Sequence, residues 1–237
     1  LPLSFAQERL WFLEQLVGHN SFYNMPLALR LDGPLDVTAL QAALDALIAR
    51  HEPLRTRFTA IDGVPRQVID AEAPVQLPIL DISELANPEA RELAARDDVA
   101  HEVARPFDLA ADWPIRARLL RLAARDHVLI ITMHHIASDG WSMGVLSREL
   151  DMLYGAFRQN HAPTLAPLSV QYADFARWQR EWLTGADLER QTAWWKAHLD
   201  GAPPVLTLPY DHPRPPRPSY RAGICTASVD AALTARL

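Results

Sequence analysis

The hydrophobic pattern changes period in the middle of the chain. Val128 to Met133 is apolar at nearly every position and rich in β-branched residues, which is typical of a strand buried on both faces. From Trp141 onward the period becomes that of an amphipathic helix, with apolar residues at Leu146, Leu150, Leu153, Tyr154 and Phe157. Residues 134–140 therefore join a buried strand to a helix.

Local signals predict further elements on both sides of this junction. Ser4 and Gln7 have the spacing of a capping box, which predicts a helix running to about Val17. The pair Asp62-Gly63 predicts a hairpin turn between two short strands. Other strands are expected at Met25 to Leu31, Thr56 to Ala60, Val64 to Ile69 and Ile115 to Leu122, with helices after Asp36, from Pro88 toward Ala104, and around Val170 to Trp182 and Asp187 to Leu199.

Two features toward the end of the chain concern packing. Trp178, Trp182, Trp194 and Trp195 recur at helical spacing, and we expect this stripe to belong to the core. Residues 203–218 hold seven of the 19 prolines, which predicts an extended, semi-rigid connection.

The junction segment, residues 134–140, carries two imidazoles, a carboxylate and a glycine. Neighbouring side chains on an extended backbone point to opposite faces, so only one of His134 and His135 can face a given cavity. Histidine is suited to proton transfer near neutral pH, and a helix N-terminus offers free N–H groups to an oxyanion. A buried structural histidine and an Asp139 that only caps the helix are equally open alternatives.

Composition narrows the class of protein. The 237 residues are 49% hydrophobic and 22% charged, enough to bury a core as one domain. We expect a cytoplasmic protein without a membrane partner, because no apolar run has membrane-spanning length and the chain begins at Leu1 without a targeting segment. The net charge of −6 argues against a nucleic-acid partner, and the single cysteine, Cys225, excludes an internal disulfide framework.

The junction motif and five other segments together resemble one family. His134-His135-x-x-x-Asp139-Gly140, followed by Trp141-Ser142, is similar to the core motif of condensation domains from nonribosomal peptide synthetases. Related acyltransferases share part of this motif, so the companion segments make the resemblance specific. These segments, in the order expected for the family, are Ser4 to Leu13, Arg50 to Phe58, Arg105 to Leu109, Tyr172 to Gln179 and Leu208 to Pro215.

The resemblance implies an α/β fold: a chloramphenicol acetyltransferase-like lobe with a mixed β-sheet flanked by helices. Such domains have two lobes with the active site in a tunnel between them. We expect residues 1–200 to form the amino-terminal lobe, 201–222 a proline-rich lobe connection, and 223–237 the truncated start of the carboxy-terminal lobe. An isolated lobe should be inactive, because one wall of the tunnel is missing.

The activity implied by the resemblance is amide bond formation between a donor acyl or peptidyl thioester and an acceptor aminoacyl thioester. Both substrates are carried on phosphopantetheine, so no cofactor or metal is expected to bind directly. The implied partners are upstream and downstream peptidyl carrier proteins, an adjacent adenylation domain and the missing carboxy-terminal lobe. The motifs at Ser4 and Arg50 look most like the subtype that joins two L-configured residues. A non-catalytic recruitment domain and a freestanding coenzyme A-dependent acyltransferase are the alternatives.

The matching positions suggest a role for each site residue. His135 is assigned to the tunnel, either as a base or as a group that positions the amine, and His134 to a structural place inside the lobe. Asp139 is expected to face back toward the sheet and to pair with Arg55, with Arg50 as a second candidate. Gly140 either permits a backbone geometry or close approach that a side chain would block, or is a simple turn glycine.

Overall fold

The computed structural model describes residues 1–18, 20–213 and 225–236. Its contacts divide the chain into two units, Leu1–Trp194 and Trp195–Leu237. The first unit holds the sheets and every candidate site residue, and the second contains a short helix, α7 (Ala231–Thr234). Part of the proline-rich connection lies outside the described residues, and the domain boundaries given above stay predictions.

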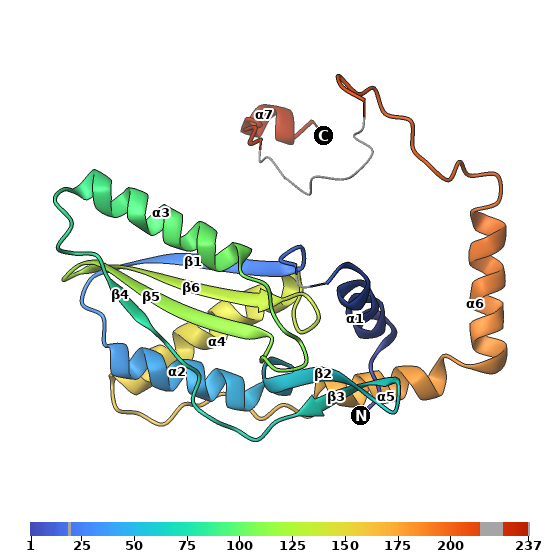
Figure 1. Ribbon diagram of the computed structural model, residues 1–237, viewed down its shortest axis with the longest axis horizontal. Helices are drawn as coiled ribbons and strands as arrows, with labels where there is room; N and C mark the ends of the chain where they lie inside the picture. The colour runs from blue at the N-terminus through green and yellow to red at the C-terminus, as the bar shows by residue number, and fades with distance from the viewer. Residues whose placement is uncertain (19, 214–224, 237) are drawn as a thin grey trace. The chain divides into compact units, whose positions relative to one another are not determined.

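A four-stranded mixed sheet forms the centre of the first unit (Figure 1). The central strand β6 pairs antiparallel with β1 and with β5, while β4 pairs parallel with β5. In order across the sheet, the strands are β1 (Asn24–Asp32), β6 (Asp126–His134), β5 (Ile115–Ala123) and β4 (Ile79–Asp81). The apolar run predicted to be a doubly buried strand is therefore an interior strand of the sheet.

Helices cover both faces of this sheet, with α2 and α4 on one face and α3 on the other (Figure 1). A separate hairpin of β2 and β3 turns at Asp62 and Gly63, which have positive φ angles of 52° and 75°. The remaining bounds are α1 (Phe5–Val17), α2 (Val37–Arg50), the 3-10 helix η1 (Glu52–Arg55), β2 (Thr56–Ile61), β3 (Val64–Ile69), α3 (Pro88–Ala104), α4 (Gly140–Arg158), α5 (Tyr172–Trp182) and α6 (Gly185–His198).

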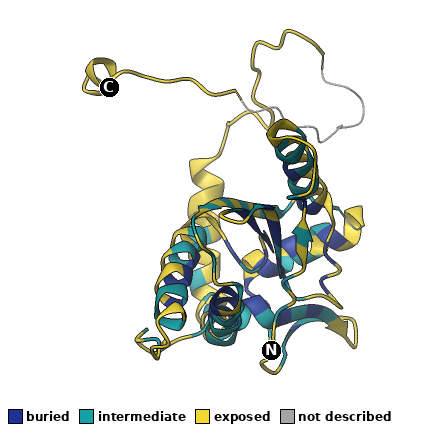
Figure 2. Ribbon diagram, turned by 90° about the vertical axis from the view of Figure 1, so that its left-hand side faces the viewer, coloured by how far each residue is buried: buried dark blue, intermediate teal, exposed yellow. Residues whose placement is uncertain are grey.

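The core follows the alternation of side chains along β6. Leu129, Ile131 and Met133 belong to a cluster with buried residues of α2 and α4, whereas Val128 and Ile130 belong to a cluster with the α3 side. Figure 2 shows the buried residues gathered in the sheet and on the helix faces turned toward it. Both faces of β6 are thus covered, which fixes the direction in which the strand leaves the sheet at His134.

The predicted fold class is confirmed, since the chain forms a mixed sheet flanked by helices. The expected tryptophan stripe is wrong as a core element. Trp178 and Trp182 stack on each other at 5.2 Å but are 53% and 45% exposed, and Trp194 and Trp195 are also exposed. Helical spacing places aromatic residues on one face, but it does not say whether another element of the chain covers that face.

Candidate active site

The junction between β6 and α4 forms a tight turn closed by Asp139. This residue is the N-cap of α4, and its Oδ1 accepts hydrogen bonds from the Ser142 backbone N–H at 2.8 Å and from the Ser142 hydroxyl at 2.7 Å. Gly140 is the first helical residue, its φ is not positive, and a Cβ placed on it would contact nothing within 4 Å among the described residues. The expectation that Gly140 permits a special geometry or close approach is therefore wrong within this chain.

His134 points into the lobe, as its place on the strand predicts. It is only 1% exposed, and its Nδ1 accepts a hydrogen bond from the Ile136 backbone N–H at 3.0 Å. The rings of Tyr23 and Phe107 lie on it, each with a centroid distance of 6.0 Å. Burial, with a smaller contribution from the charge of His135, lowers the pKa of His134 from 6.5 to about 4. The His134 imidazole is therefore neutral near pH 7.

His135 points the other way and is exposed. Its backbone N–H donates to the Tyr23 carbonyl at 2.8 Å, and its Nδ1 lies 2.6 Å from the Ser138 carbonyl oxygen. A carbonyl oxygen can only accept a hydrogen bond, so Nδ1 must carry the hydrogen. The neutral ring then has its lone pair on Nε2. The turn thus fixes the tautomer in which Nε2 can accept a proton.

A cavity of about 540 Å³ opens at His135. Asp139 and Ser142 belong to its wall, together with residues of α1 and the first residue of α5. Arg9, Tyr23 and Tyr172 also line the cavity, although no role was predicted for them from the sequence. Arg9 and Tyr172 lie within motifs that match the family, and these motifs are the only sequence feature that indicates a place at the site. No feature of the sequence indicates that Tyr23 lies there. A second cavity of about 380 Å³, with a mainly apolar lining, shares Ala137, Ser138, Ser142 and Tyr172 with the first.

The expected ion pair between Asp139 and Arg55 is not formed. The Asp139 carboxylate is exposed and borders the His135 cavity instead of facing the sheet. Hydrogen bonds from the Ser142 hydroxyl and N–H lower the pKa of Asp139, with a smaller contribution from His135. Arg55 donates to the carbonyl oxygen of Asp70 and lies 3.7 Å from the Glu52 carboxylate. Asp139 is therefore held at the start of α4 by its role as helix cap, and Arg55 is held at the end of β3 by its bond to Asp70.

Arg50, the second candidate partner of Asp139, belongs to a different cluster. Its Nε lies 3.1 Å from Oε2 of Glu149 on α4, and Nε2 of His51 lies 2.6 Å from the same oxygen. Burial alone would raise the pKa of Glu149, but His51 and Arg50 outweigh it and the pKa is lowered. Gln171 donates to the Arg50 carbonyl at 2.9 Å. The cluster ties the end of α2 to α4 and to the start of α5.

Two other kinds of feature are missing from the described residues. No group of three or more His, Cys, Asp or Glu side chains among them is arranged to hold a metal ion. No helix in the described ranges is both long enough and apolar enough to cross a membrane.

The fold and the site together define a class of protein, namely an α/β lobe in which one histidine is held in a fixed tautomer near a helix N-terminus. Comparison with known proteins identifies the family: the sequence model of the family described as Condensation domain matches residues 1–237. The chain belongs to this family. It is 50% identical over its whole length to part of a linear gramicidin synthase from Brevibacillus parabrevis, and 44% identical over 221 residues to an isonitrile lipopeptide synthase of Mycobacterium tuberculosis.

Solved structures agree with the fold. The X-domain from teicoplanin biosynthesis superimposes with a TM-score of 0.80 at 40% identity, covering 94% of this chain and 48% of that one. The starter condensation domain of rhizomide synthetase RzmA gives a TM-score of 0.73 at 24% identity, which supports the fold only. The chain thus spans about half of these solved chains, and only 3% and 9% of the two synthases.

Proposed function

We propose that this chain is the amino-terminal half of a condensation domain that forms peptide bonds between carrier-bound thioesters. The observation that carries the proposal is the fixed tautomer of His135, whose Nδ1 donates to the Ser138 carbonyl at 2.6 Å and whose Nε2 is left to accept a proton at an open cavity. Membership of the family and relatives that are peptide synthases support it. The motifs at Ser4 and Arg50 favour the subtype that joins two L-configured residues.

In the proposed reaction, the acceptor amine nitrogen attacks the donor thioester carbonyl carbon. The new C–N bond gives a tetrahedral oxyanion, and the proton lost by the amine moves to Nε2 of His135. Collapse of the intermediate breaks the C–S bond, and the departing thiolate takes the proton back from Nε2 of His135 to become the free thiol. An α-amino group has a pKa of about 7.7 to 8.0, so much of it is already neutral and positioning by Nε2 contributes alongside proton transfer.

The second half of the domain, two peptidyl carrier proteins and an adjacent adenylation domain are the proposed partners. The chain spans 48% of the X-domain chain, so the opposite wall of the active site belongs to the part beyond this sequence. Positioning of two reactants can supply about 7 to 11 kcal/mol of a barrier, and a single wall cannot provide it. We therefore expect the 237-residue chain to be inactive by itself.

One observation favours a second candidate, a recruitment domain without catalysis. The X-domain, 40% identical to this chain, has also been solved in a complex with OxyB. Against this candidate, the turn in this chain retains both histidines, Asp139 and Gly140, with His135 exposed at a cavity. The freestanding coenzyme A-dependent acyltransferase is the weaker alternative, because the relatives are far longer synthases.

Single-turnover peptide formation in the full synthetase that contains this chain tests the proposal. With both carriers loaded, His135→Ala should abolish product formation, whereas the exposed His161→Ala should leave the rate unchanged. Normal turnover by folded His135→Ala protein would refute the assignment. An unaltered synthetase that joins no loaded substrates, yet binds another protein through this domain, would support the recruitment function instead.

A further inference from the structure

The segment Arg105 to Leu109 matches the family, but the proposed chemistry does not use it. The structure places its central residue, Phe107, against the buried histidine of the turn. Phe107 is only 1% exposed, and its ring meets the His134 imidazole edge-on, at 6.0 Å and 85°. This contact links the end of α3 to the turn that carries His135.

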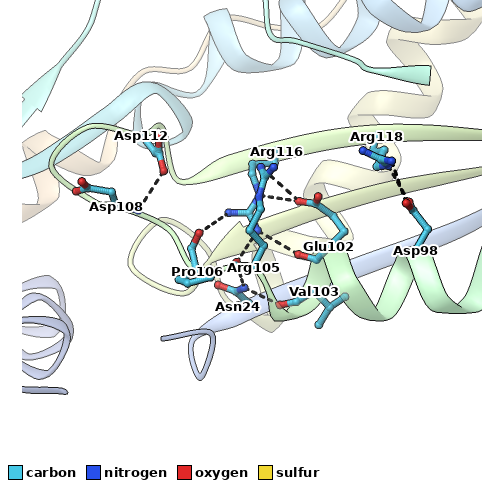
Figure 3. Close-up of polar contacts among 10 residues, drawn as sticks. All are labelled: Asn24, Asp98, Glu102, Val103, Arg105, Pro106, Asp108, Asp112, Arg116 and Arg118. Atoms are coloured by element: carbon cyan, nitrogen blue, oxygen red, sulfur yellow. Dashed lines mark hydrogen bonds and ion pairs between the residues drawn. The ribbon is translucent and has the colours of Figure 1, made fainter. Parts of the chain in front are cut away.

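Arg116 on β5 holds the loop at Arg105 and Pro106, which directly precedes Phe107 (Figure 3). Its guanidinium donates to the Glu102 carboxylate at 2.6 Å and to the carbonyl oxygens of Glu102, Arg105 and Pro106 at 3.2, 2.8 and 3.2 Å. A cation is favoured at this position, because the carboxyl end of a helix carries a partial negative charge. One side chain therefore fixes the path of the chain from the last turn of α3 to Phe107.

The same guanidinium lies over the Phe107 ring, with 3.7 Å between its central carbon and the ring centroid. Phe107 is thus enclosed between Arg116 and His134. Asn24 strengthens the arrangement from β1, because its amide donates to the Val103 and Arg105 carbonyls at 2.7 and 2.8 Å (Figure 3).

His134 in turn organises the residues that follow it. Its N–H donates to the Pro114 carbonyl at 3.0 Å, its carbonyl accepts from the Ala137 N–H at 3.0 Å, and its Nδ1 accepts from the Ile136 N–H. These bonds set the turn whose Ser138 carbonyl holds the His135 ring. A shift of the His134 ring would therefore displace the Ile136 N–H that its Nδ1 accepts from, and with it the turn.

We propose that Arg116 is a positioning residue for His135, acting through Phe107 and His134. The catalytic consequence rests on the proposed function, whereas the effect on the His135 ring does not. Arg118 provides a matched control, because it also pairs with α3, with 2.7 Å from its Nε to Oδ2 of Asp98 (Figure 3). In the described part of the chain, the polar contacts of the Arg118 guanidinium go to Asp98 and not to the loop at residues 105–107.

The first experiment measures the tautomer of His135 by nitrogen-15 NMR in the 237-residue chain, comparing Arg116→Met, Phe107→Leu and Arg118→Met. The original chain and Arg118→Met should show the tautomer with hydrogen on Nδ1. Arg116→Met and Phe107→Leu should show a mixture of both tautomers, because the Ser138 carbonyl no longer meets the ring. If Arg116→Met does not fold, Phe107→Leu decides the matter. Spectra of His135 that stay unchanged in a folded Arg116 or Phe107 variant would overturn the proposal.

The second experiment measures steady-state condensation in the full synthetase. Arg116→Met should lower kcat about tenfold or more with little change in KM, because a displacement near 1 Å can cost up to about a hundredfold. Arg118→Met should change kcat less than about twofold on the same reasoning. An equal loss in both variants would reduce Arg116 to a purely structural role. If the unaltered synthetase makes no peptide bond, the proposed function fails, but the NMR result still decides whether Arg116 positions His135.

Discussion

Replacing Asp139 distinguishes a helix cap from a buried ion pair. The Oδ1 of Asp139 accepts from the Ser142 N–H at 2.8 Å and from its hydroxyl at 2.7 Å, and the carboxylate is exposed. Loss of an N-cap costs about 0.5 to 2 kcal/mol. Breaking one partner of a buried ion pair would cost about 3 to 5 kcal/mol. The two interpretations therefore differ by a margin that unfolding experiments resolve.

Thermal unfolding of the chain, followed by circular dichroism at pH 7, measures this margin. Asp139→Ala should lower Tm by about 2 to 4 °C, which is the effect of about 1 kcal/mol in a chain of this size class. Asp139→Asn should lose much less, because an amide oxygen can accept the same two hydrogen bonds and only the charge at the helix N-terminus is removed. A loss of more than about 3 kcal/mol in Asp139→Ala would restore the ion-pair interpretation.

The pH dependence gives an independent check. The folded-state pKa of Asp139 is lowered, so its carboxylate contributes stability that is present above the pKa of the unfolded chain and is lost as the pH falls through the folded value. The difference in stability between the original chain and Asp139→Asn should therefore shrink as the pH drops below about 4. A difference that grows in acid would refute this account. In the full synthetase, lost activity in a normally stable Asp139→Asn protein would point to a direct chemical role.

Three further predictions concern His134, the Glu149 cluster and the aromatic face of α5. His134→Phe should make the chain less sensitive to acid: the folded pKa is lowered to about 4, so stability is complete above about 6.5 and is lost as the pH falls between these values. The difference between the two pKa values corresponds to about 3 kcal/mol at about 1.4 kcal/mol per pH unit. If the urea midpoint of His134→Phe fell between pH 7 and pH 4 as much as that of the original chain, the prediction would be wrong. Glu149→Gln should lower the free energy of unfolding in urea by about 3 to 5 kcal/mol, because Arg50 is left without its partner. As a control, Arg30→Met should lower it by less than about 1 kcal/mol, because the ion pairs of Arg30 are exposed. Equal losses in the two variants would contradict this prediction. The exposed aromatic face of α5 should favour self-association, so the sedimentation coefficient should rise with protein concentration. Trp178→Gln should reduce this rise. A sedimentation coefficient that does not depend on concentration would contradict the prediction.

Local pattern predicts much of the fold, because the decisive signals act over a few residues. The capping box at Ser4, the turn at Asp62 and the alternation along β6 each predict a feature that the structure contains. The opposite directions of His134 and His135 follow from the same alternation. What could not be predicted depends on contacts between distant segments. The partner of Arg55, the exposure of the α5 aromatic face and the presence of Tyr23 at the cavity are all of this kind.

Some polar side chains in or next to the matching motifs bind the backbone of distant segments, and the sequence does not reveal these contacts. Gln179 of α5 accepts from the Phe5 N–H at 3.0 Å, and Arg180 donates to the Leu3 carbonyl at 2.7 Å. Tyr172 shares a hydrogen bond of 3.0 Å with the Ser4 hydroxyl while lining the His135 cavity. Such bonds hold α1 and α5 together at the cavity. The motif from Tyr172 to Gln179 can therefore match a family through the position of its helix, although Tyr172 is the one residue of this motif that lines the His135 cavity.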